Sequence, residues 1–414
     1  MASNVCALCP VHPDVLKDSQ YNFYNMFRIF YQIALVLIIG LLLSGCSVNT
    51  GKRVYPGMEW KESSPESQDM DPAKLSEAID FLNSKLASTG GIQTLVIIRN
   101  GYLVHKGSEA YKVHCIWSGT KSFTSTVLGL LVGEGRCSLN TKAMDITDLM
   151  KEKYPGITLR HFATMTSGYD AAGGRYGEED PDDGSKTPLV PADPAFAPGT
   201  EYSYFDDAMR MNGYLLTLIA GMDLESYFER KIAIPVGMDT ANFKWDFYPE
   251  NDKVYTWSNP QGADVRDGAG GLYITPLDLA RFGYLFLNHG NWNGHQLLSA
   301  EWVREATACQ VPADMAWRND TPRQRQLGQR GVGRYGYNWW LNATGEDGKL
   351  LYPDAPADLY LASGYNNNKC FVIPAWDMVI VRTGNEGTPD DADFIWDQFL
   401  KMVGNSLKDT PANL

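Results

Sequence analysis

Residues 115–132 read Cys-Ile-Trp-Ser-Gly-Thr-Lys-Ser-Phe-Thr-Ser-Thr-Val-Leu-Gly-Leu-Leu-Val, and this stretch decides how the rest of the chain is interpreted. Ser118 opens a helical pattern that ends near residues 133–135, and Lys121 follows one helical turn later on the same face. A serine hydroxyl becomes a nucleophile when a base takes its proton, and burial or a helix start can keep a lysine neutral enough to be that base. The alternative is that Ser118 only caps the helix and Lys121 is a solvated first-turn lysine.

The composition limits the kinds of protein that this chain can be. It has 414 residues, 44% hydrophobic and 12% aromatic, so it can bury a large core in one or two domains. The net charge of −13 argues against nucleic acid as a partner and against electrostatic adhesion to anionic lipid, because both need a basic face. Only Cys6 and Cys9 are closely spaced, so no structural zinc is expected in the body of the chain. The pairing of four later cysteines is left open: Cys115, Cys137, Cys309 and Cys370.

The N-terminal region has the pattern of an export signal. An apolar run over residues 29–43 follows Arg28 and ends in Leu43-Ser-Gly-Cys46. Its 15 residues are fewer than the roughly 20 that a membrane-spanning helix needs, but they suit the apolar region of a signal peptide. The ending resembles the lipobox of bacterial lipoproteins, in which the cysteine receives lipid and becomes the mature N-terminus. The alternative is an uncleaved anchor helix; both would tether the protein to a membrane.

We therefore expect three segments. A signal sequence covers residues 1–45, with Met26 as a second candidate for the true start, so translation of residues 1–25 is left open. A polar, lipidated tether covers residues 46–70, and one folded domain covers residues 71–414. Ser47 follows the cysteine where an aspartate would signal retention, which by the resemblance implies the outer membrane in a Gram-negative host and the cell surface otherwise.

Strands are expected at both ends of the domain and helices between them. Asp71-Pro72 starts an amphipathic helix, and residues 94–105 read as a hairpin with a type I′ turn at Asn100-Gly101. Residues 169–200 form a long acidic loop, which is either a substrate-covering lobe or a solvated surface loop. This order predicts an α+β body whose two ends build one antiparallel sheet. The remaining expected elements are helices at 158–168, 206–221, 223–233, 275–288, 299–308 and 390–404, and strands at 369–373 and 378–382.

A second cluster with chemical potential is Pro198-Gly-Thr-Glu-Tyr-Ser-Tyr204-Phe-Asp206. A tyrosine oxygen beside a lysine ammonium can hold or pass a proton, so Tyr204 could deprotonate the serine or protonate a leaving group. The alternative is that Tyr204 is a structural turn residue ahead of the next helix.

Several segments, in order, resemble the serine β-lactamase-related hydrolases, a superfamily of class C β-lactamases, D-alanyl-D-alanine carboxypeptidases and esterases. The resemblance covers roughly residues 70–405 and is greatest to the branch that contains 6-aminohexanoate-dimer hydrolase. It implies a serine β-lactamase-like α+β fold, in which an antiparallel sheet flanked by helices is joined by an all-helical lobe, with the active site between them. The segments are Ser118-Gly-Thr-Lys121, Leu159–Gly168, Pro198–Asp206, Gly270–Gly283 and Tyr335–Trp340.

The resemblance also implies roles for single residues. Ser118 would be the acylated nucleophile, Lys121 its base, and Tyr204 would complete the proton network. Asp206 stands where the family usually has asparagine; its carboxylate would favour the ammonium form of Lys121, or would simply orient it. The third family motif has no clean counterpart.

Its best placement is Ala362-Ser363-Gly364, where Ala362 replaces the family's cation, although Lys369 is near in sequence. The backbone N–H groups of Ser118 and Tyr365 would then form the oxyanion hole.

The sequence thus favours an exported, membrane-tethered serine hydrolase that acts on small esters or amides and needs no metal or organic cofactor. The alternatives are a cell-wall D-Ala peptidase or β-lactamase, and a non-catalytic binding lipoprotein on the same fold. There is no Gly-x-Ser-x-Gly and no His-Glu-x-x-His. The histidines, including His105, His114 and His161, are expected to be structural. The substrate would be set by the 169–200 loop and by the surroundings of Trp339, Trp340 and Tyr365.

Replacing Cys46 tests the lipid anchor. The variant Cys46→Ala should leave the membrane fraction and become soluble, because the residue that carries the lipid is gone. Fractionation of cells that express the wild type or the variant measures this. Full membrane retention of the variant would rule out lipid attachment at Cys46.

Overall fold

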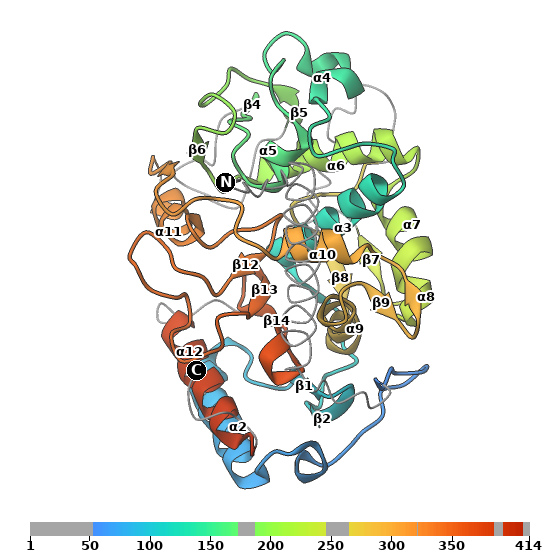
Figure 1. The fold of residues 1–414 in the computed structure, drawn as a ribbon, viewed down its shortest axis with the longest axis vertical. Helices are drawn as coiled ribbons and strands as arrows, with labels where there is room; N and C mark the ends of the chain where they lie inside the picture. Colours follow the sequence, from blue (N-terminus) through green and yellow to red (C-terminus); the bar gives the residue numbers. More distant parts are fainter. Residues whose placement is uncertain (1–52, 173–186, 246–264, 321, 385–391, 409–414) are drawn as a thin grey trace, which may run out of the picture. The chain divides into compact units, whose positions relative to one another are not determined.

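The computed structural model describes residues 53–172, 187–245, 265–320, 322–384 and 392–408 (Figure 1). The predicted signal sequence, the lipobox with Cys46 and the acidic part of the 169–200 loop lie outside these residues. Val54–Leu414 form one compact unit.

A six-stranded antiparallel sheet is built from the two ends of this unit. β1 and β2 form the predicted hairpin, in which Asn100 and Gly101 both have positive φ, as a type I′ turn requires. β15 pairs with β1, so the C-terminal strands continue the sheet that the N-terminal hairpin starts. The order is β12 (Trp340–Leu341), β13 (Tyr360–Gly364), β14 (Asn368–Ile373), β15 (Met378–Arg382), β1 (Val96–Arg99) and β2 (Tyr102–Lys106).

Helices cover both faces of the sheet, which explains why its central strands are apolar on both sides. α2 (Pro72–Leu86) and α12 (Ala392–Ser406) lie side by side on one face (Figure 1), where Ile97 and Phe371 meet Trp396. α9 (Pro276–Leu287) covers the other face, where Val96 and Val372 join its core. Alternate residues of one strand therefore belong to two different cores.

A helical region adjoins the α9 side of the sheet, and α3 (Thr120–Gly133) is its central helix. Residues 120–131 of α3 are all buried, so the helix is surrounded by protein. Phe123 stacks on Phe282 of α9 with ring centroids 3.8 Å apart, which joins the helical region to the sheet. The surrounding helices are α4 (Ala143–Ile146), α5 (Leu159–Ala163), α6 (Asp206–Ala220), α7 (Leu224–Phe228), a π-helix (Glu229–Ala233), α8 (Ile234–Val236), α10 (Ala300–Ala306) and α11 (Pro322–Gly331).

Short elements complete the unit. A three-stranded sheet joins β3 (His114–Cys115), β8 (Leu272–Ile274) and β7 (Lys244–Trp245). The other pairs are β4 (Ala171–Ala172) with β5 (Thr187–Pro191), β6 (Glu201–Tyr202) with β11 (Ala316–Trp317), and β9 (Asn291–Trp292) with β10 (His295–Gln296). The 3-10 turns are Pro65–Gln68, Ala87–Thr89, Trp117–Gly119, Asp148–Met150 and Pro374–Trp376.

Three expectations need correction. The tether does not extend over residues 54–70, because Trp60 and Met70 are buried and Glu62 bridges to Leu103 of β2. The helix expected over 158–168 is only α5, since the chain leaves the helix at Thr164 and reaches Gly168 with a positive φ. The 169–200 segment is not all loop, because β4 and β5 pair across it.

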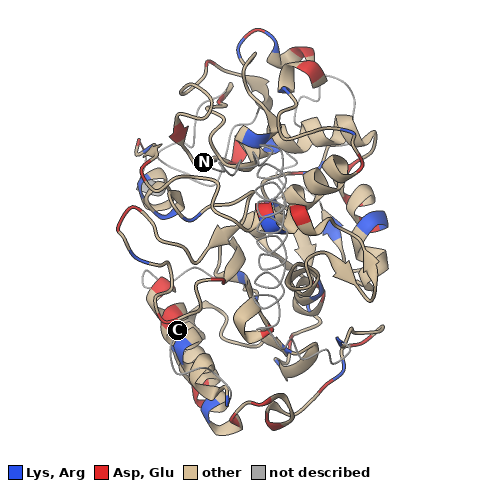
Figure 2. Cartoon of the chain, in the orientation of Figure 1, with Lys and Arg blue, Asp and Glu red and all other residues tan. Residues whose placement is uncertain are grey.

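Lys and Arg side chains are scattered among Asp and Glu along the described chain (Figure 2). Among the described residues, no helix is long and apolar enough to cross a membrane. Cys137, Cys309 and Cys370 are unbridged thiols.

Candidate active site

Ser118 lies in the 3-10 turn Trp117–Gly119, directly before α3. The segment that precedes Ser118 is fixed because the Ile116 N–H donates to the Leu272 carbonyl of β8, at 2.9 Å. Trp117 has φ +49°, a left-handed conformation that is unfavourable for a bulky residue. Such strain is typical of functional turns. The turn leaves Ser118 half-buried at the entrance to the helical region.

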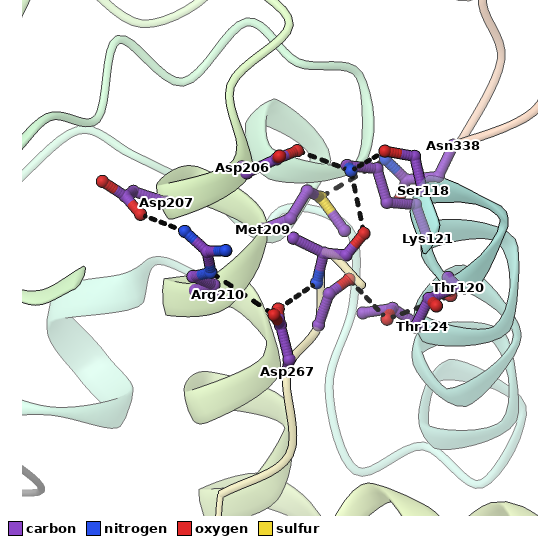
Figure 3. Close-up of polar contacts among 12 residues, drawn as sticks. Ser118, Thr120, Lys121, Thr124, Asp206, Asp207, Met209, Arg210, Asp267 and Asn338 are labelled. Carbon is purple, nitrogen blue, oxygen red and sulfur yellow. Dashed lines mark hydrogen bonds and ion pairs between the residues drawn. The ribbon is translucent and has the colours of Figure 1, made fainter. Parts of the chain in front are cut away.

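Lys121 is almost completely buried, with 1% of its surface exposed. Its Nζ lies 2.9 Å from Ser118 Oγ, 2.9 Å from the Ala269 carbonyl oxygen and 2.6 Å from Asp206 Oδ1 (Figure 3). The alternative of a solvated first-turn lysine is therefore wrong. These partners come from three parts of the chain, and each approaches the same nitrogen.

The chemistry of these partners fixes the direction of the Lys121 amine. A carbonyl oxygen and a carboxylate can only accept hydrogen bonds, whereas a hydroxyl can either accept or donate. A neutral amine has two N–H groups and one lone pair. If the N–H groups point to Ala269 and Asp206, the lone pair points to the proton of Ser118. If Lys121 is an ammonium instead, the same three oxygen atoms can accept hydrogen bonds from all three of its N–H groups. The geometry therefore suits both states that a general base passes through.

Asp206 is the first residue of α6, where the positive end of the helix dipole stabilises a carboxylate. Its side chain is only 13% exposed, and its partner Lys121 is more buried still. An ion pair of this kind is weakly screened by solvent. The predicted neighbourhood of Asp206 and Lys121 is thus present, and the carboxylate favours the ammonium form of the lysine.

Tyr204 lies beside Lys121 through its ring. The ring centroid is 4.8 Å from Lys121 Nζ, a cation–π distance. On its other sides the ring stacks on Trp340, with centroids 5.7 Å apart, and meets Tyr335 edge-on at 6.2 Å. The structure therefore brings Tyr204 to the site. The proposed role of its hydroxyl in proton transfer stays a prediction.

The end of β13 lies directly against the turn Trp117–Gly119, which carries Ser118. A Cβ added to Gly364 would lie 2.0 Å from the Ile116 carbonyl oxygen, so only glycine allows this approach. Tyr365 follows the strand and is 45% exposed; its ring meets Trp117 edge-on, with centroids 5.6 Å apart. The end of the 362–364 strand therefore lies next to the turn that carries Ser118, and its assignment as the third family motif stays a prediction. The oxyanion hole itself remains a prediction.

Ala362 points into the core and offers nothing to the site, but a cation does reach the neighbouring residue. Ser363 pairs with Lys369 across β13 and β14, and Lys369 Nζ donates to Ser363 Oγ at 2.6 Å. Burial lowers the pKa of Lys369 to about 8. The sequence shows only that Lys369 is a cation close to Ala362 along the chain. The register of β13 and β14 is what pairs it with Ser363.

Some features of the site had no clear sequence signal. The Ala269 carbonyl is a backbone group, although it adjoins the Gly270-Gly271 segment. Asn338, which lies beside Ser118 and Lys121 in Figure 3, has φ +59°. Its carbonyl accepts from Ser122 Oγ of α3 at 2.8 Å, so the Tyr335–Trp340 segment is fixed beside the site. Trp339, expected near the substrate, is instead fully buried against Phe282.

His161 is structural, as predicted. Its Nδ1 accepts the Thr158 N–H at 3.1 Å and closes the start of α5. Within the described ranges, no group of three or more His, Cys, Asp or Glu side chains is placed to hold a metal ion.

The sequence model of the β-lactamase family matches residues 86–401, which is most of the chain. The chain belongs to this family. A protein named β-lactamase from Escherichia coli (strain K12) is 27% identical over 161 residues; the match covers 37% of this chain and 41% of that protein, well under two thirds of its length.

Solved structures show the same β-lactamase fold. A protein from Bacteroides dorei DSM 17855 named as a β-lactamase has a TM-score of 0.62 and 20% identity, with 82% of this chain and 100% of that chain covered. A protein from Bacillus anthracis named as a 6-aminohexanoate-dimer hydrolase has a TM-score of 0.55 and 19% identity, with coverage of 74% and 76%. A family VIII carboxylesterase has a TM-score of 0.58 and 16% identity, with coverage of 79% and 96%. The predicted family and the α+β fold are therefore confirmed.

In this β-lactamase-family site, the buried Lys369 predicts a pH-dependent stability change. Its folded pKa of about 8 lies below the 10.5 of an unfolded lysine, so the buried ammonium destabilises the folded state at neutral pH, and unfolding takes up a proton only between these two pKa values. The penalty is full below pH 8 and shrinks as the pH rises towards 10.5. Lys369→Met should therefore stabilise the protein at about pH 6.5, on the order of 2 kcal/mol after the loss of the Ser363 bond, and less at about pH 9.5.

Urea unfolding at both pH values measures this change. The exposed Lys401 provides the control, because Lys401→Met removes a lysine whose charge is already solvated. An equal effect of Lys369→Met at the two pH values would contradict a Lys369 pKa that burial has lowered.

Proposed function

We propose that this protein is a serine hydrolase that cleaves the ester or amide bond of small acyl compounds through an acyl-enzyme on Ser118. The observation that carries the proposal is the buried Lys121, whose nitrogen lies 2.9 Å from Ser118 Oγ while two acceptor-only groups take its other bonds. A buried amine aimed at a hydroxyl is a costly arrangement that structure alone does not need.

The reaction follows from these contacts. Lys121 takes the proton of Ser118 as Oγ attacks the carbonyl carbon, and a tetrahedral oxyanion forms. The ammonium, directly or through Tyr204, then returns the proton to the leaving oxygen or nitrogen as that bond breaks. Water attacks the acyl-enzyme in the same way, which releases the acid and restores Ser118. Asp206 stabilises Lys121 while it carries the extra proton.

The oxyanion would be bound where β13 meets the nucleophile turn. The backbone N–H groups of Ser118 and Tyr365 are the proposed donors, and each such donor contributes on the order of 3 kcal/mol. The close approach of Gly364 to Ile116 supports this assignment, because it fixes the distance between the strand and the turn.

The substrate class is argued from the surroundings of Ser118. The exposed Tyr365 supplies aromatic surface against Trp117. The rings of Tyr204 and Trp340 are buried and stack on each other, with Tyr204 against Lys121. The 169–200 segment has a small hollow of its own, lined by Ser167, Gly168, Tyr169, Ala195, Phe196, Ser203, Phe205 and Gln324. The family VIII carboxylesterase among the structural neighbours is consistent with ester substrates.

Removal of the nucleophile tests the proposal. Ser118→Ala should abolish turnover of short p-nitrophenyl esters, by about 10³-fold or more, because the remaining groups cannot form an acyl-enzyme. A fluorophosphonate should label the wild type at Ser118 and leave the variant unlabelled, as read by intact mass. Ser125→Ala, a buried serine on the same helix, is the matched control and should keep both signals.

The other outcomes point to the alternatives. Covalent labelling of Ser118 by fluorescent penicillin without ester turnover would favour the cell-wall peptidase or β-lactamase. No fluorophosphonate labelling, together with no activity that depends on Ser118, would favour the non-catalytic binding protein.

The carboxylate of Asp206 should set the pH dependence of the reaction. An opposite charge this close favours ammonium, so Asp206→Asn should let Lys121 lose its proton more easily. The midpoint of the pH–rate curve for ester hydrolysis should then move to lower pH by about one unit or more. Glu201→Gln is the control, because it removes the charge of an acid that is close to Asp206 in sequence but belongs to β6 rather than to the start of α6. An unchanged midpoint in Asp206→Asn would mean that Asp206 only orients the lysine.

We also propose that the hydrolase acts at a membrane surface, tethered by lipid on Cys46. The sequence pattern around Cys46 supports this proposal, and the fractionation of Cys46→Ala tests it.

A further inference from the structure

The Ala269 carbonyl that accepts from Lys121 is carried by a short turn, residues 267–269. This turn connects to α6 and α3 through buried side chains (Figure 3). Because a carbonyl oxygen has no side chain to orient it, its direction depends on what fixes the peptide units around it.

The side chain of Asp267 forms a hydrogen bond within this turn. Its Oδ1 accepts the Ala269 N–H at 2.8 Å, so the side chain holds the residue whose carbonyl contacts Lys121. Its Oδ2 accepts from Arg210 Nε of α6 at 3.5 Å, and Arg210 also donates to Asp207 at 2.8 Å. All three side chains are buried. The turn is thereby attached to the helix that begins with Asp206, the other acceptor of Lys121.

Two further contacts attach the same turn elsewhere. Thr124 Oγ1 of α3 donates to the Gly268 carbonyl at 2.8 Å, one helical turn beyond Lys121. Trp245 Nε1 donates to the Asp267 carbonyl at 2.8 Å. Gly268 lies so close to α6 that an added Cβ would be 2.3 Å from the Met209 carbonyl oxygen. Every peptide unit of the turn is therefore fixed to a neighbouring element.

A buried charged group of this kind is not required for stability, because apolar side chains of similar volume often serve as well. What it provides is direction: hydrogen bonds fix angles that apolar packing leaves loose. We propose that Asp267, held by Arg210 and Asp207, is a positioning residue that aims the Ala269 carbonyl at Lys121 and so turns the amine towards Ser118. This inference rests on the proposed acyl-enzyme chemistry, in which Lys121 is the base, and it concerns how the amine of Lys121 is aligned with Ser118.

The test is Asp267→Asn, which keeps the size of the side chain but replaces one acceptor by a donor that faces Arg210. We expect kcat for a p-nitrophenyl ester to fall about tenfold or more, because small misplacement of a catalytic group is costly. KM should change little, since no group of the proposed pocket is altered. The rate of fluorophosphonate labelling should fall in parallel.

The control is Asp278→Asn. Asp278 and Arg281 on α9 form another buried Asp–Arg pair, with the i,i+3 spacing of Asp207 and Arg210, and their ion pair lies within α9, outside the 267–269 turn. This variant should lower the melting temperature and leave kcat and the labelling rate near the wild-type values.

A second pair of variants keeps the test decisive if Asp267→Asn does not fold. Thr124→Val removes the hydroxyl that holds the Gly268 carbonyl, and Thr126→Val removes a hydroxyl that only bonds within α3, to the Ser122 carbonyl. We expect a lower kcat in Thr124→Val alone.

Wild-type kcat in both Asp267→Asn and Thr124→Val would overturn the proposal, as would equal losses in the control variants. A crystal structure of either variant in which the Ala269 O to Lys121 Nζ bond is unchanged would overturn it whatever the activity. An inactive, unlabelled wild type would instead overturn the proposed function, so the two failures are distinguishable.

Discussion

The buried amine of Lys121 is the constraint on which the site depends. An amine that has left water must have each of its hydrogens matched by an acceptor, because an unmatched buried donor carries a large desolvation cost. Here the partners are the Ala269 carbonyl, Asp206 and Ser118. They belong to the 267–269 turn, to the start of α6 and to the turn directly before α3. The site therefore exists only when these elements have assembled.

The architecture explains how such distant pieces meet. α3 is buried along residues 120–131, and the hydroxyl groups of Ser122 and Thr124 bond to backbone of neighbouring segments, so its position is fixed on more than one side. The sheet then brings β13, a strand from the C-terminal part of the chain, against the turn that precedes α3. Because the first and last strands of the unit pair with each other, the two ends of the domain are joined in the same sheet that carries β13.

The two departures from the family pattern have different physical consequences. Asp206 adds a negative charge beside Lys121, which stabilises the ammonium form of the lysine. In the proposed reaction, Lys121 therefore loses its proton at an additional free-energy cost before it can act as the base. Ala362 removes a cation from its usual strand position, while Lys369 supplies an amine to Ser363 from the adjacent strand. Since burial lowers the pKa of Lys369 to about 8, this amine is a weaker and more pH-sensitive charge than an exposed lysine would be.

The sequence by itself determined what is local: the hairpin at Asn100-Gly101, the helix that starts after Ser118, the alternating strands and the order of the family motifs. Ser118, Lys121, Tyr204 and the approach of the 362–364 strand could all be expected from it. Only the tertiary structure decided which groups surround the lysine. The Ala269 carbonyl lies 148 residues from Lys121, and a backbone acceptor leaves no mark in the sequence. The burial of Trp339 and the pairing of Ser363 with Lys369 likewise depend on packing and strand register, which side-chain type alone does not specify.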